Sequence, residues 1–303
     1  MNIILYFAEI SLTWAIFYIL YVLFLRKETF FNLNRWFLLL AIGSGILLPL
    51  VRQLPQSILS GIPTYNQLSL TLPIFTIQES SLVAGSTPAL FDPIQWLLYL
   101  YITGLLIALV KFGLGIFKIF KIYNAAERIV KDNYTLVVSE MVQLPFSFLR
   151  SVYVNPSFLN NKGFKKILEH ELTHIKLKHT HDILLIHLIC ILFWWNPLVY
   201  LYRRALKETH EYMADEQACH SSDLKNYGQI LLGHSSSGIE LALTHQFFNS
   251  LLKNRFNMLY KKKSAKHQLL RYSLFFPCLF GLAILFSSQT TYAENTNSNS
   301  DQT

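Results

Sequence analysis

Four long apolar runs divide the chain. The first, Ile3 to Leu25, contains a single charged residue, Glu9, and is long enough to cross a hydrocarbon layer of about 30 Å. It lacks a basic start and a small-residue cleavage site, so we expect a retained span rather than a signal peptide. The other three runs are Trp36 to Val51, Ile94 to Phe117 and Leu269 to Ser288. The pattern predicts about four transmembrane helices.

Basic residues beside these runs give them a direction. After the first run lie Arg26, Lys27 and Arg35, and at the end of the third lie Lys111, Lys118 and Lys121. Before and at the start of the last run lie Lys261–Lys263, Lys266 and Arg271. Between Arg52 and Pro93 the only basic residue is Arg52. Cytoplasmic loops are enriched in Lys and Arg. We therefore expect residues 52–93 outside the membrane and the segment between the third and last runs in the cytoplasm.

Composition agrees with a membrane protein. Hydrophobic residues make up 52% of the chain and charged residues 15%, whereas about a quarter of a soluble domain is charged. The net charge of +8 is concentrated beside the apolar runs, as expected for contacts with anionic lipid, and no basic stripe with interleaved aromatics indicates nucleic-acid binding. Cys190, Cys219 and Cys278 are too scattered for a disulfide framework or a cysteine metal site.

A hydrolytic metal motif lies in the cytoplasmic segment. His170-Glu171-Leu172-Thr173-His174 places two histidines four residues apart, on one face of a helix, where both can bind one Zn²⁺. Glu171 is then placed to act as a general base on water. Phe164, Ile167, Leu168, Leu172 and Ile175 recur at helical spacing, and Asn160 or Asn161 is available to cap the helix.

A catalytic zinc site needs a third protein ligand. In "RRALKETHEYMADEQACH", the carboxylates Glu208, Glu211 and Asp215 share one helical face. Glu211 is the candidate ligand, and Asp215 can hydrogen-bond a liganding imidazole. His210 lies on another face and ranks below Glu211. The alternative is an ordinary acidic, solvated helix face. His179, His181 and His187 are interpreted as structural, with His181 and Asp182 as a pair.

The two metal segments are separated by an apolar run. Ile183 to Tyr202, "ILLIHLICILFWWNPLVYLY", is as apolar as a membrane span. A single crossing would put Glu211 on the opposite side of the membrane from His170 and His174. Basic residues flank the run on both sides, and Trp194-Trp195-Asn196-Pro197 interrupts it. We therefore expect two short helices that return to the cytoplasmic side.

These features together resemble a known family, the BlaR/MecR-type membrane zinc metallopeptidases, whose well-known members are bacterial beta-lactam sensors. The resemblance extends over about residues 1–288, in the order two spans, outer loop, third span, HExxH, "FWWNPLVYLYRR", "HEYMADEQA" and last span. The "WNPLVY" segment and the Glu211–Asp215 spacing are more specific than HExxH. "LPFSFLRSVYVNP" (Leu144–Pro156) is similar to the family's strand region before the metal helix.

The resemblance implies a gluzincin site, with His170, His174 and Glu211 as zinc ligands, Glu171 as general base and Asp215 in support. The region Leu144–Val154 would supply the sheet edge for a peptide substrate, with Leu144, Pro145, Phe146, Ser147 and Phe148 as candidate contacts. Well-known members also carry a large extracellular domain with a Ser-x-x-Lys motif. Only Glu294 to Thr303 is expected outside here, without that motif, so beta-lactam sensing is not implied.

The expected fold is mainly α: a polytopic membrane protein with about four transmembrane helices and a cytoplasmic α+β gluzincin-like domain. Its parts are two transmembrane helices (1–51), an extracytoplasmic loop (52–93), a third transmembrane helix (94–117), the peptidase domain (118–268, with an apolar hairpin at 183–202), a last transmembrane helix (269–288) and a disordered extracytoplasmic tail (289–303).

The function expected is that of a zinc endopeptidase of the bacterial inner membrane with a cytoplasmic active site, which transduces an envelope signal. Its partners would be the lipid bilayer, a protein substrate (a winged-helix repressor or the chain itself) and a second copy in a homodimer, without direct nucleic-acid binding. The alternatives are a quality-control membrane protease and a non-catalytic receptor or scaffold.

Overall fold

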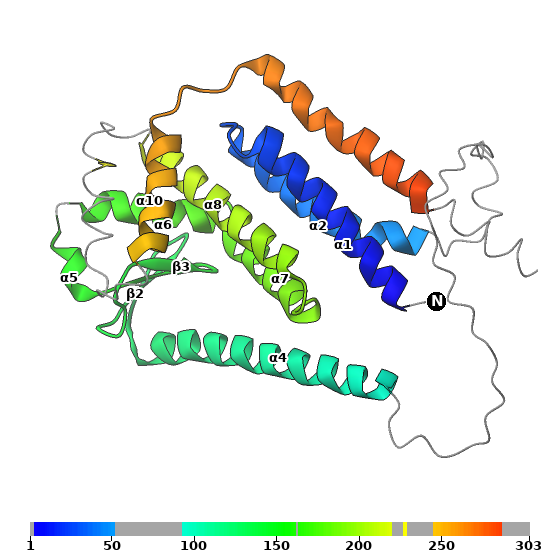
Figure 1. Ribbon diagram of the computed structural model, residues 1–303. Coiled ribbons are helices and arrows are strands. Elements are labelled where there is room, and N and C mark those ends of the chain that lie inside the picture. The colour runs from blue at the N-terminus through cyan, green and yellow to red at the C-terminus, as the bar shows by residue number, and fades with distance from the viewer. Residues whose placement is uncertain (1–2, 52–92, 162, 220–226, 229–244, 287–303) are drawn as a thin grey trace, which may run out of the picture.

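The structure, a computed structural model, describes residues 3–51, 93–161, 163–219, 227–228 and 245–286, and the described part is mainly helical. The predicted extracytoplasmic loop and tail lie outside the described residues. Figure 1 shows the apolar helices on one side of the molecule and the small sheet with its neighbouring helices on the other.

Four helices are long and apolar enough to cross a membrane. They are α1 (Ile3–Leu20, continued by the π-helical turn η1, Tyr21–Leu25), α2 (Phe31–Val51), α4 (Pro93–Ala125) and the terminal helix (Lys266–Phe286), whose first part is the 3-10 segment η2 (Lys266–Leu274). α2 and α4 extend beyond the apolar runs because helical hydrogen bonding continues into the flanking polar residues.

The run that separates the two metal segments forms a helical hairpin. α7 (His179–Leu192) and α8 (Pro197–Cys219) lie side by side and are joined by a turn at residues 193–196. Asn196 Oδ1 caps α8 by accepting from the Leu198 backbone NH at 3.0 Å, and its Nδ2 donates to Ser11 Oγ of α1 at 2.9 Å. Because the chain reverses at this turn, the far ends of α7 and α8 lie at the same end of the molecule.

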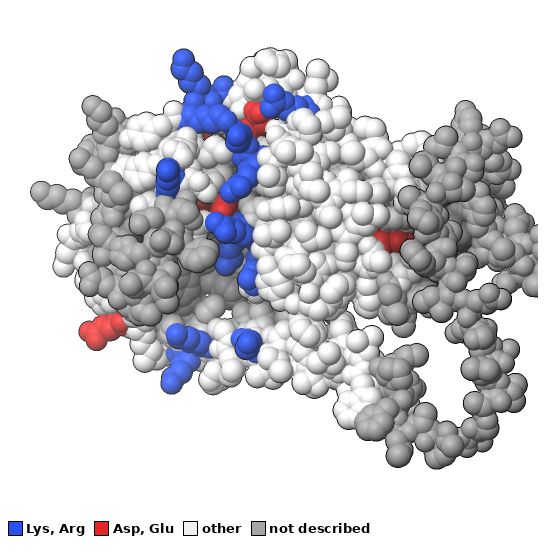
Figure 2. Space-filling view, in the orientation of Figure 1, with Lys and Arg blue, Asp and Glu red and all other residues white. Residues whose placement is uncertain are grey.

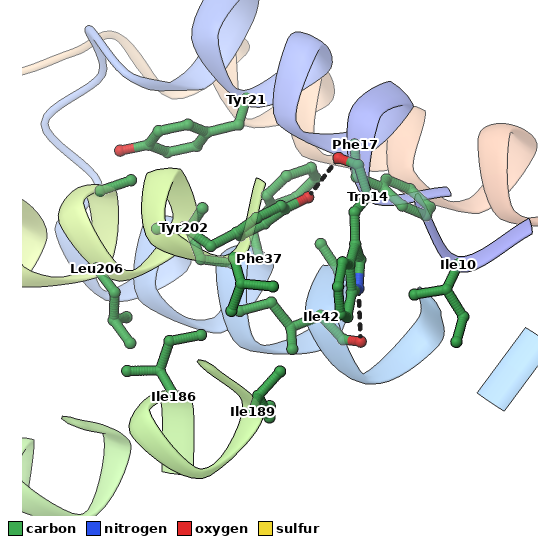
Figure 3. Close-up of a cluster of buried hydrophobic side chains, with 14 of the residues drawn as sticks. Ile10, Trp14, Phe17, Tyr21, Phe37, Ile42, Ile186, Ile189, Tyr202 and Leu206 are labelled. Atoms are coloured by element: carbon green, nitrogen blue, oxygen red, sulfur yellow. Dashed lines mark hydrogen bonds between the residues drawn. The ribbon is translucent and has the colours of Figure 1, made fainter. Parts of the chain in front are cut away.

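One apolar core joins this hairpin to α1, α2 and the terminal helix (Figure 3). Trp14, Phe17 and Tyr202 are fully buried in it. The side-chain polar atoms of Tyr202 and Trp14 donate to backbone carbonyls: Tyr202 Oη donates to Trp14 O at 3.0 Å, and Trp14 Nε1 donates to Ile42 O at 3.1 Å. A buried aromatic with a satisfied polar group adds apolar contact without a desolvation penalty.

α4 contacts the hairpin near its turn and the sheet at its own C-terminal end, where Ile122 packs on Val137 and Tyr153. A Cβ on Gly104 would lie 2.2 Å from the Trp194 ring, so only glycine permits this approach. Tyr101 Oη also donates to Leu192 O at 2.9 Å. Most of the large apolar side chains of α4 are exposed, which is expected of a helix whose other faces contact lipid.

The sheet has four short strands in the order β1-β2-β4-β3. They are β1 (Glu127–Val130), β2 (Thr135–Val138), β3 (Phe146–Phe148) and β4 (Ser151–Val154). β2 and β4 pair in parallel, and β1 and β3 are antiparallel edge strands. The region Leu144–Val154 contains the edge strand β3 and also β4, which lies inside the sheet. Of the candidate contacts, Phe146–Phe148 form the edge strand and Leu144 and Pro145 precede it.

Three shorter helices complete the described chain: α5 (Pro156–Leu159), α6 (Phe164–Lys176) and α10 (His245–Leu259).

The expectation that Asn160 or Asn161 caps the helix with the histidine motif, α6, was wrong. Gly163 occupies the cap position without a side-chain bond. Asn161 Oδ1 instead accepts from the Gly163 backbone NH at 3.0 Å, the two-residue reach of an Asx turn.

Charge marks the boundary between the two parts. Figure 2 shows a band of Lys and Arg side chains between the largely uncharged surface of the apolar helices and the part that carries the sheet. Such a band is typical of residues that meet lipid headgroups.

Candidate metal centre

The helix α6 positions the first three candidate residues between the sheet and α8. Its apolar face, Phe164, Leu168, Leu172 and Ile175, packs against Leu136, Val138, Val152 and Val154 of β2 and β4. The opposite side carries His170 and His174, four residues apart, toward α8. His170 and Glu171 are buried. The amphipathic pattern of α6 therefore orients the motif.

Glu211 of α8 joins the two histidines. Within the described residues, side-chain donor atoms of His170, His174 and Glu211 lie within 4.8 Å of one another. The two Nε2 atoms are 3.3 Å apart, and the Glu211 oxygens lie 3.6 Å from His170 Nε2 and 3.7 Å from His174 Nε2. Tetrahedral Zn²⁺ with bonds of about 2.0–2.1 Å separates its ligand atoms by about 3.3 Å. The two nitrogens and the Glu211 carboxylate therefore lie at separations close to those of zinc ligands.

Asp215 contacts the Nδ1 side of the His170 ring, away from His174. Asp215 Oδ1 lies 3.3 Å from His170 Nδ1 and accepts a hydrogen bond from Tyr227 Oη at 2.7 Å. Burial lowers the pKa of His170, but the carboxylates of Asp215 and Glu211 outweigh it and raise that pKa to about 10 in the metal-free protein. This contact orients the ring with Nε2 toward Glu211.

His174 is held by a residue that the sequence did not identify. His179 Nδ1 lies 2.8 Å from His174 Nδ1. Lys178, with φ 57°, adopts the left-handed conformation between α6 and α7 and turns His179 back toward the motif. Burial and the neighbouring His170 lower the pKa of His174 to about 4. The ring is therefore neutral at physiological pH, the form that binds a metal.

A buried polar cluster continues from His179. Its ring stacks on His210 at a centroid distance of 4.0 Å. His210 Nε2 lies 2.9 Å from Asp182 Oδ2, and Arg35 of α2 donates to both oxygens of Asp182, at 2.6 and 3.2 Å. Asp182 thus pairs with His210 and Arg35, so the interpretation as a pair with His181 was wrong.

Glu171 lies beside the edge strand. Among the groups that act on its pKa is the side chain of Ser147 of β3. Burial is the largest influence on Glu171 and raises its pKa, although His170 and Ser147 partly oppose this. A carboxylate with a raised pKa is a better proton acceptor near neutral pH.

Glu208 does not join the metal group. It is buried and pairs with Arg26 at 3.4 Å and Arg204 at 3.1 Å. A shared helical face therefore does not distinguish the candidate ligand Glu211 from Glu208, whose carboxylate pairs with arginines.

Arg255 of α10 is a further residue of the centre that the sequence did not identify. Its Nε and Nη2 donate to Asp215 at 2.8 and 2.5 Å, and its Nη1 lies 3.0 Å from Glu211 Oε2. Burial raises the pKa of Glu211, but His170 and Arg255 outweigh it and hold that pKa well below its usual range. No spacing motif links Arg255 or Tyr227 to the histidines, so only the tertiary structure could identify them.

The model of the BlaR1 peptidase family, M56, matches residues 3–259. The chain belongs to the BlaR1 peptidase family. It is therefore a membrane-associated peptidase of the BlaR1 type, which confirms the resemblance seen in the sequence. The comparison with curated proteins gives no match.

Proposed function

We propose that the protein is a zinc endopeptidase that cleaves protein substrates at the cytoplasmic face of the membrane. The observation that carries this proposal is the convergence of His170, His174 and Glu211 at zinc-like spacing, beside the buried Glu171. Three protein ligands leave one coordination position open, as in catalytic zinc sites, whereas structural sites are usually closed by four.

Each residue has a separate task in this proposal. A bound Zn²⁺ supplies Lewis-acid activation of water and of the scissile carbonyl. Glu171 accepts the proton of the attacking water and delivers it to the leaving amine nitrogen. Asp215 and His179 accept hydrogen bonds from the Nδ1 atoms of His170 and His174, which leaves each Nε2 lone pair free for the metal.

The edge strand β3 offers a place for the substrate. It pairs with β4 on one side only among the described strands. An extended peptide can add to such an edge through its backbone hydrogen bonds. Because Ser147 of β3 contacts Glu171, a peptide bound there would run past the general base.

The distribution of charge supports a cytoplasmic active site. The band of basic residues lies between the apolar helices and the sheet (Figure 2), and Lys and Arg accumulate on the cytoplasmic side. The hairpin returns α8 to the end that carries α6, so the ligands of both helices share one side. We propose that an envelope signal triggers cleavage of the chain itself or of a cytoplasmic winged-helix repressor.

The decisive experiment compares the wild-type protein with Glu171→Gln in membranes. The variant keeps its shape and all three ligands, so it should bind zinc normally and lose cleavage of itself and of a co-expressed candidate repressor. Chelation should stop the wild-type reaction, and added Zn²⁺ should restore it. Undiminished proteolysis by Glu171→Gln would refute the assignment.

Two measurements separate the alternatives. Purified wild-type protein without bound zinc would favour a receptor or scaffold. Cleavage of damaged membrane proteins, with an adjacent repressor left intact, would favour a quality-control protease.

A further inference from the structure

The side chain of Arg255 bridges the two carboxylates that α8 presents to the metal centre. Its fork donates to both oxygens of Asp215, at 2.8 and 2.5 Å, and its third nitrogen lies 3.0 Å from Glu211. The side chain is 19% exposed and Asp215 only 3%. A planar guanidinium held by two carboxylates fixes their orientation, which a single ammonium charge does not.

The chain that follows Arg255 is fastened to the turn between α1 and α2. Thr29 N donates to Ser264 Oγ at 2.9 Å, and Ser264 N donates to Thr29 Oγ1 at 2.8 Å. We call this reciprocal pair the latch. Just beyond it, Arg271 of the terminal helix bonds the buried Glu28. The latch therefore links α10 to both the first and the last membrane segments.

We propose that Arg255 is a positioning residue for the metal centre and that the latch sets its position. The inference rests on the proposed zinc site. With Arg255 in place, Asp215 keeps Oδ1 toward His170, and Glu211 keeps one oxygen paired while the other faces the metal. When the terminal helix moves relative to the α1–α2 turn, α10 moves with it and Arg255 leaves the two carboxylates.

The structure leaves room for this movement. A cavity of about 170 Å³ lies between the latch and the metal centre, lined by Thr29, Phe31, Asp215, Arg255 and Lys263 among others. Beside the cavity, Met258 of α10 packs on the cluster of Phe31, Tyr212 and Met213, so the room for a shift lies in the cavity itself. A shift of the terminal helix can reach the centre without unfolding α8.

The first test measures zinc binding by the full chain in detergent, through competition with a chromophoric chelator. Arg255→Ala and Arg255→Lys should both raise the zinc dissociation constant about 10- to 100-fold, the usual effect of losing a residue that orients a ligand. The visible spectrum of the Co²⁺-loaded protein should also change, because it reports ligand geometry. Lys253→Ala, an exposed site on the same helix, is the matched control.

The second test asks whether the latch acts through Arg255. Thr29→Val combined with Ser264→Ala removes both hydroxyls and should weaken zinc binding several-fold. In the Arg255→Ala background the same changes should have little further effect, since coupled residues give non-additive effects. Additive effects would overturn the role of the latch.

The outcomes separate this inference from the proposed function. Wild-type protein that binds no zinc would refute the proposed function. Zinc binding by wild-type protein, together with unchanged affinity and Co²⁺ spectrum in both folded Arg255 variants, would overturn the inference alone. Arg255→Lys keeps the positive charge, so the test does not depend on whether Arg255→Ala folds.

Discussion

The imidazole of His179 contacts the candidate metal ligand His174 and is not itself a member of the candidate ligand set. Replacing it with leucine removes the partner of His174 Nδ1, which lies 2.8 Å away. His179→Leu should weaken zinc binding about 10- to 100-fold, measured by chelator competition. His179→Gln should recover part of the loss, because its amide oxygen can accept the same hydrogen bond.

His181 provides the control for this prediction. It is exposed and only two residues away, so His181→Leu should leave zinc affinity unchanged. Equal affinities of His179→Leu and the wild-type protein would contradict the positioning role of His179.

Asp182 of α7 links Arg35 of α2 to His210 of α8 and gives stability a pH dependence. Burial raises its pKa, but hydrogen bonds from His210 and Arg35 outweigh it and hold the pKa below the ordinary 3.8. A depressed folded-state pKa contributes stability above the ordinary pKa, and this contribution disappears as the pH falls through the folded value.

Asp182→Asn should therefore lower the free energy of unfolding at pH 7 by about 3 kcal/mol, since it leaves the partly buried guanidinium of Arg35 without its carboxylate. The difference from the wild-type protein should shrink below about pH 4. Thermal unfolding in detergent at both pH values would measure it. Asp132→Asn, at an exposed position, should have little effect, and a deficit in Asp182→Asn that is independent of pH would contradict the argument.

The site residues differ in how far the sequence could predict them. His170, Glu171 and His174 follow from spacing on one helix, and Glu211 and Asp215 from spacing on another. His179 could not be predicted, because it reaches His174 only through the left-handed turn at Lys178. Arg255 comes from a helix whose own pattern contains no chemical motif, so its role depends entirely on how α10 packs.

At the scale of the elements, a glycine permits the close contact between α4 and the hairpin turn. Gly104→Leu should separate α4 from the hairpin turn, because even a Cβ would lie 2.2 Å from Trp194. We expect a thermal midpoint several degrees lower and faster proteolysis at the α4–β1 connection. Gly113→Leu on the same helix meets open space and should change neither. Equal behaviour of the two variants would contradict this mode of attachment.

Helices were easier to predict than strands for a physical reason. Apolar runs and the Trp194–Pro197 interruption mark α1, α2, α4, α7 and α8 directly in the sequence. The strands are only three or four residues long, too short for alternation to be distinctive. That β4 lies inside the sheet and β3 at its edge depends on a parallel pairing between β2 and β4, which local sequence does not encode.

The arrangement of the whole molecule predicts which segments can be reached from each side of the membrane. In a chain whose native cysteines are replaced, Lys176→Cys and Lys207→Cys flank the hairpin and should both react with an impermeant maleimide only after the membrane is opened. A cysteine placed between residues 52 and 92 should react in intact cells. Labelling of the two flanking sites from opposite sides would exclude a shared metal centre.

Because Arg255 lies in α10, it is synthesised after all three candidate metal ligands. A ribosome releases α6 and α8 first, so a nascent chain carries all three candidate ligands before Arg255 and Ser264 exist. With Arg255 in the proposed role, the centre reaches its final arrangement only after the terminal helix has been made and seated against the α1–α2 turn. Translation and membrane insertion themselves would then delay the onset of proteolysis.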